Sequence, residues 1–82
     1  MAYPKELALF RVTQDSYLKK GELVEFQNHT NIFPDAIRVI PLDGPERCMD
    51  HDDGRWVILH RHQLKPLTPT ALQVWELLEN QS

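Results

Sequence analysis

Short apolar segments separated by turn-forming residues are the feature that most limits what this chain can fold into. Between residues 7 and 67, Gly, Pro, Asn or Asp interrupts the apolar pattern repeatedly. The resulting segments are too short for ordinary helices, but they match the usual length of β-strands. The pattern predicts strands at 7–13, 22–28, 36–42, 55–60 and 64–67.

Alternation of apolar and polar residues within these segments indicates antiparallel pairing. In 22–28, Val24 and Phe26 share one face of the predicted strand, and the polar residues between them share the other. The segment 55–60 is apolar on both faces, so we expect it to be the most buried strand. Pro41 lies near the end of its segment, where an edge strand tolerates a missing backbone donor.

A helix signal follows the last predicted strand. Thr68 is a suitable N-cap residue, and Pro69 stands at the first helical position, where its missing N–H costs nothing. One face of the predicted helix carries apolar residues at helical spacing, namely Ala71, Val74, Trp75 and Leu78. The chain is therefore expected to consist of a β-domain at 1–67 and a helix at 68–82 that packs on it or binds a partner.

Length and charge restrict the classes of function. A chain of 82 residues is one small domain, and a net charge of −3 argues against generic nucleic-acid binding, which favours a basic excess. The sequence shows neither an apolar run of membrane-spanning length nor a secretory signal pattern. Cys48 is the only cysteine, which excludes an internal disulfide. We expect a cytoplasmic protein with no membrane segment.

Two stretches resemble Src-homology-3 domains. In 8-ALFRVTQDSYLKKGELVEF-26, the apolar opening and the segment from Leu18 to Gly21 are similar to the first strand and long loop of such domains. The stretch 54-GRWVILHRHQLKPL-67 is similar to their strand, single helical turn and closing strand. The resemblance implies a mainly β fold: a small five-stranded Src-homology-3-like barrel, here followed by one C-terminal α-helix.

The resemblance also implies an interaction module. Eukaryotic domains of this type bind proline-rich peptides in an aromatic groove. Here the first strand offers only Phe10, and Arg61, His62 and Gln63 replace the Pro and Tyr expected before the last strand, so the full groove is not reproduced. Small solitary barrels of this kind also occur among phage and mobile-element proteins.

We therefore predict a small protein-binding module of adaptor or inhibitor type, without catalysis and without a cofactor. Tyr17, Trp56, His60 and His62 are expected to form an exposed aromatic and imidazole surface for the partner. Trp75 is expected to anchor the helix or the partner. Leu72 and Leu77 widen the apolar face of the helix and suggest a homodimer interface.

The alternative is a nucleic-acid-binding barrel. The basic segment 60–65, together with aromatic residues, is of a kind that tracks a nucleic-acid strand. The acidic residues nearby in the sequence oppose this function. The residues that would contact phosphates are Lys19, Lys20, Arg61 and Lys65.

A zinc-stabilised domain is the second alternative. Its ligands would be Cys48, His51, His60 and His62, although their spacing matches no standard zinc motif. The acidic segment 50–54 does not fit a calcium loop, because its glycine falls at the fifth position rather than the sixth. No nucleophile and base are placed together by the sequence, so we expect no enzymatic activity.

Overall fold

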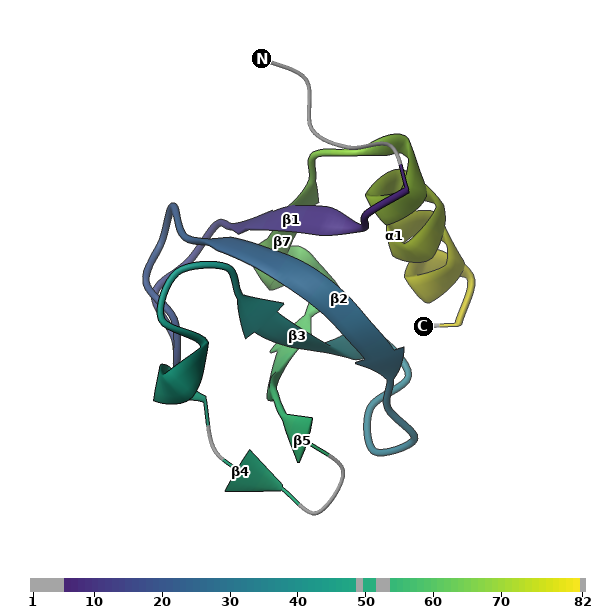
Figure 1. Cartoon of the computed structure of the whole chain (residues 1–82). Helices are drawn as coiled ribbons and strands as arrows, with labels where there is room; N and C mark the ends of the chain where they lie inside the picture. Colours follow the sequence, from purple (N-terminus) through teal and green to yellow (C-terminus); the bar gives the residue numbers. More distant parts are fainter. Residues whose placement is uncertain (1–5, 49, 52–53, 82) are drawn as a thin grey trace.

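Five antiparallel strands form one sheet, and one helix packs beside it (Figure 1). The computed structural model describes residues 6–48, 50–51 and 54–81. The sheet has the order β6-β3-β2-β1-β7. Its strands are β1 (Leu9–Val12), β2 (Leu23–His29), β3 (Ala36–Pro41), β6 (Val57–His60) and β7 (Leu64–Pro66). The remaining elements are η1 (Pro45–Arg47), the two-stranded pair β4 (Asp50–His51) and β5 (Gly54–Arg55), η2 (Arg61–Gln63) and α1 (Pro69–Gln81).

The prediction of five strands and a C-terminal helix in a mainly β protein is confirmed. Segment 55–60, however, does not form one continuous strand, because β5 and β6 are separated at Trp56. The prediction that this segment is the most buried strand is wrong. β6 lies at an edge of the sheet, and of its four residues only Leu59 is fully buried. Apolar residues on both faces indicated a central strand, but the strand order decides which strands are central.

The position of Pro41 also differs from the expectation, since β3 is an interior strand. Pro41 pairs with Val24 of β2, and the next amide, that of Leu42, donates to the carbonyl of Leu23. Because successive N–H groups of a strand point to opposite sides, the missing donor of Pro41 faces the side of β6. The pairing of β3 with β6 has already ended at Val39. The proline therefore removes no ladder hydrogen bond.

The core lies between the inner face of the sheet and α1. Alternate residues of β1, β3 and β6 point into it, as strand geometry requires. The predicted apolar face of α1 is confirmed: Ala71 and Leu78 are fully buried, and Val74 and Trp75 pack against the cluster. Burying a large apolar side chain stabilises a fold by about 1.5–3 kcal/mol. The largest fully buried side chains are Phe10, Ile37, Leu59, Leu78, Val12, Val24, Val39 and Pro41.

The buried hydroxyl of Thr68 joins the start of α1 to β1. Its Oγ1 donates to the carbonyl of Leu7 at 2.6 Å and accepts the amides of Leu9 at 3.3 Å and Ala71 at 3.1 Å. The bond from Ala71 is the predicted N-cap, and Pro69 begins the helix as predicted. One side chain thus caps α1 and fixes its first turn against the sheet.

Arg61 and Trp75 hold the rest of α1. The Arg61 guanidinium lies 3.4 Å from the Trp75 ring centroid and donates to the Trp75 carbonyl at 3.1 Å. In return, the Trp75 indole Nε1–H donates to the Arg61 carbonyl at 3.2 Å. Arg61 also donates to Glu79 at 3.1 Å. The α1 helix has 13 residues, and no helix in the described part of the chain is long and apolar enough to span a bilayer.

Thr68→Val should lower the free energy of unfolding by about 2 kcal/mol, because it removes the helix cap and leaves the buried Leu9 amide and Leu7 carbonyl without their partner. Thr68→Ser, which keeps the hydroxyl, serves as the matched control. Urea denaturation followed by circular dichroism measures both. A loss for Thr68→Ser with none for Thr68→Val would show that the methyl group, not the hydroxyl, holds this junction.

Trp75→Ala should lower the free energy of unfolding by about 3 kcal/mol, because packing, the indole hydrogen bond and the contact with Arg61 are lost together. Leu72→Ala is the control on the same helix. Leu72 is 43% exposed, so its removal should change stability by no more than about 0.5 kcal/mol. A Trp75→Ala loss as small as the control's would mean that α1 does not depend on this contact.

Candidate partner-binding site

The outer face of β3 and β6, away from the core, carries the candidate site. Arg38 pairs with Ile58, and Ala36 with His60. Since Ile37, Val39 and Leu59 face the core, the residues between them face outward. We call this face, together with Phe33 at one end and Trp56 at the other, the outer strip. Its members are Phe33, Arg38, Trp56, Ile58 and His60.

At one end of the outer strip, Trp56 is held by two ring contacts. The His51 ring stacks on it with centroids 3.7 Å apart and an interplanar angle of 8°. The Arg38 guanidinium carbon lies 4.2 Å from the Trp56 ring centroid, which is cation–π distance. These contacts come from β4 and β3 and keep a large, half-buried aromatic side chain in a defined place.

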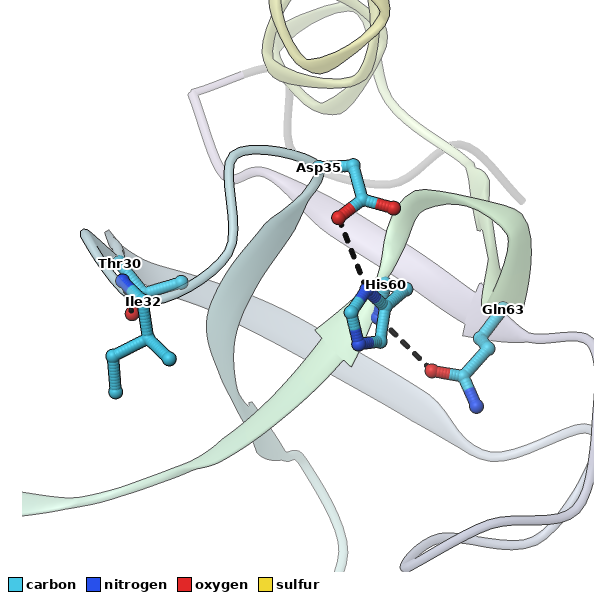
Figure 2. A network of polar contacts seen from close by, with 5 residues as sticks. All are labelled: Thr30, Ile32, Asp35, His60 and Gln63. Carbon is cyan, nitrogen blue, oxygen red and sulfur yellow. Dashed lines mark hydrogen bonds and ion pairs between the residues drawn. The ribbon is translucent and has the colours of Figure 1, made fainter. Parts of the chain in front are cut away.

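At the other end, His60 is oriented by two polar contacts (Figure 2). Its ring Nδ1 lies 3.1 Å from Asp35 Oδ1, and its backbone N–H donates to Gln63 Oε1 at 2.9 Å. The His60 ring lies 5.0 Å from Phe33 and 5.7 Å from His62, measured between ring centroids. Phe33, His60 and His62 therefore form a row of neighbouring rings.

The loop between β2 and β3 is tied to the sheet next to this row. The Asp35 side chain contacts His60 of β6, and the Asp35 carbonyl accepts the amide of Arg61 in η2 at 2.8 Å. Within the loop, Thr30 Oγ1 accepts the Ile32 amide at 3.2 Å. Despite these ties, the loop presents two adjacent apolar side chains to solvent: Ile32 is 65% exposed and Phe33 is 42% exposed. An apolar pair on an ordered loop is already arranged for binding.

The structure places some of the predicted partner-binding residues together and others apart. The contact with Arg38 places Trp56 at the outer face that also carries His60, and His62 lies next to His60. Tyr17 is 83% exposed on the loop between β1 and β2, and within the described residues no ring contact connects it to the strip. Trp75 belongs to the contact between α1 and η2, where it holds the helix.

The four basic residues of the nucleic-acid hypothesis lie on three different elements. Lys19 and Lys20 are on the loop between β1 and β2, where Glu22 and Asp15 accept their backbone amides. Lys65 is on β7, opposite Arg11 of β1. The guanidinium of Arg61 is engaged by Glu79 and by Trp75.

The four residues of the zinc hypothesis do not form a cluster either. Cys48 is buried just after η1, and His51 stacks on Trp56 at the far end of the strip from His60 and His62. Across residues 6–48, 50–51 and 54–81, no group of three or more His, Cys, Asp or Glu side chains is placed to hold a metal ion.

Sequence reasoning missed Ile32, Phe33, Asp35 and Arg38. The signals were present: an Ile-Phe pair inside an otherwise polar loop, and an arginine inside an apolar strand. Neither signal indicates a site by itself, because exposed apolar residues and outward-facing charges are common in small domains.

No protein-family model, curated protein or solved structure matches this chain.

Asp35→Ala should free the loop between β2 and β3 with little effect on global stability. The contact between Asp35 and His60 is partly exposed, so its loss should cost less than about 1 kcal/mol. Amide hydrogen exchange at residues 31–33 should nevertheless become faster, because one of the ties to the sheet is lost. Asp15→Ala, in the other long loop, is the control. Unchanged exchange at residues 31–33 would show that the backbone bond to Arg61 suffices to order the loop.

Proposed function

We propose that this protein is a small, non-catalytic protein-binding module that docks its partner on the outer strip and the neighbouring loop. The observation that carries the proposal is the exposed pair Ile32 and Phe33 on a loop tied to the sheet, beside His60. Adjacent apolar side chains that remain in water when the chain folds gain most by binding another apolar surface. Aromatic anchors flanked by polar groups are typical of such interfaces.

The topology supports, as part of the proposal, a Src-homology-3-like barrel. The strand β1 pairs with both β2 and the last strand β7, and a single helical turn, η2, joins β6 to β7. A turn at this place is what the resemblance implies. This fold hosts many unrelated functions, so the argument for binding comes from the surface and not from the fold.

A homodimer through α1 remains a second, separate proposal for a partner. Leu72 and Leu77 are exposed on the helix, as the sequence predicted. Sedimentation equilibrium at rising protein concentration tests it, with Leu72→Ser and Leu77→Ser as the variants. A single monomer mass at all concentrations would exclude it.

Capture from nuclease-treated lysate of the source cells tests the main proposal. The wild-type chain should retain one protein in stoichiometric amount at moderate salt. Phe33→Ser should weaken the purified pair about tenfold or more, since an exposed aromatic anchor is removed. Tyr17→Ser, an aromatic replacement on the other long loop, is the matched control and should bind as wild type does.

Two results would count against the proposal. Equal binding by the Phe33 and Tyr17 variants would place the interface elsewhere. Recovery that disappears after nuclease treatment, with affinity falling steeply between low and moderate salt, would favour the nucleic-acid alternative, because phosphate contacts release counterions.

A further inference from the structure

A polar hollow of about 180 Å³ lies beside the Trp56 end of the outer strip. Three separate parts of the chain line it: the end of β2, the middle of β3, and the stretch from β5 to Trp56. Its lining differs in chemistry from the apolar loop at the other end of the strip, because it consists of two arginines, two carboxamide residues, one glycine and one tryptophan. The lining residues are Gln27, Asn28, Arg38, Gly54, Arg55 and Trp56.

A β-bulge builds one wall of the hollow. The register between β2 and β3 shifts between Phe26 and Asn28, so Gln27 is the extra residue of the bulged strand. Beyond the bulge, Asn28 stands opposite Arg38. Asn28 Oδ1 accepts the His29 amide at 2.8 Å. The amino group of the Asn28 side chain can therefore act only as a hydrogen-bond donor. The bulge thus places a hydrogen-bond donor beside a guanidinium.

The opposite wall supplies the second cation and the aromatic ring. Arg38 is half-buried and held over Trp56, with 4.2 Å between the guanidinium carbon and the ring centroid. Arg55 is exposed at the rim. At Gly54, with φ of +122°, no atom of the described residues lies within 4 Å of the position that a Cβ would occupy. Two arginines therefore line one small hollow in a chain whose net charge is −3.

We propose that this hollow binds the carboxylate of an acidic side chain presented by the protein partner. The inference rests on the proposed function, because Arg38 belongs both to the hollow and to the outer strip that would carry the partner. Guanidinium groups bind carboxylates through paired, charge-assisted hydrogen bonds, and carboxamide N–H groups supply further donors. The apolar loop would then give binding energy, and the hollow would select an acidic group at a set distance along the strip.

The test is a titration of the ¹⁵N-labelled full chain with glutarate at constant ionic strength, followed by nuclear magnetic resonance. The Trp56 indole N–H signal should move and saturate. The Trp75 indole, which is bonded to Arg61 at the far side of η2, should remain in place and serve as an internal control. Replacing a charged hydrogen-bond donor should weaken binding about tenfold.

Three variants make the test specific. Arg38→Gln and Arg55→Gln should each weaken glutarate binding, and Arg55, being exposed, can be replaced without disturbing the fold. Lys65→Gln removes the same charge from β7 and should leave binding unchanged. Equal weakening by all three variants would mean that only overall charge matters, which would overturn the site.

Two further outcomes also decide against the proposal. Asp52 and Asp53 precede Gly54 in the sequence and lie outside the described residues. Glutarate binding that appears only in the Asp52→Asn/Asp53→Asn chain would mean that the chain's own carboxylates occupy the arginines. A stronger response to an oligothymidylate than to glutarate would assign the hollow to phosphates. Either failure can occur while Phe33-dependent partner capture persists, so the two proposals are tested separately.

Discussion

The register between β3 and β6 is the constraint on which the rest of the structure depends. This register directs Ile37, Val39 and Leu59 into the core. The alternate positions on the same two strands face away from the core and belong to the outer strip. A slip of one residue would turn one of the two strands over and expose its core side chains, Leu59 on β6 or Ile37 and Val39 on β3. The hydrophobic cost of that exposure fixes the register. The same cost fixes the order of side chains along the strip, so stability and the candidate interface come from one pairing.

The helix α1 completes the core without covering the strip. Thr68 ties its start to β1, and Arg61 ties Trp75 to η2, so two contacts that are distant in the sequence determine where the helix lies. Arg61 follows His60 directly. The turn that holds the helix through Arg61 therefore also positions the imidazole of the candidate site, and packing and surface are linked through adjacent residues.

The two ends of the outer strip differ in chemistry, and each of the two proposals concerns one end. The end near Phe33 is apolar and aromatic, and the end near Trp56 is cationic. A partner that contacts both ends would gain affinity from the Phe33 end, because apolar burial is non-directional. It would gain selectivity from the Trp56 end, because paired guanidinium contacts are directional. The four basic residues predicted for phosphate binding, by contrast, lie on three different elements, and the Arg61 guanidinium is engaged within the fold.

The sequence alone determined the local elements. Alternation located the five strands, and Thr68, Pro69 and the apolar spacing located the helix and its buried face. It also identified Trp56 and His60 as sharing one face. Only the tertiary structure decided the order of the strands, which made the segment expected to be most buried an edge and β3 an interior strand. It also brought Phe33 and Asp35 to His60, and Arg38 to Trp56. The physical reason is that strand periodicity and helix capping act over a few residues, whereas these contacts join positions 18 to 27 residues apart, whose proximity depends on which strands pair.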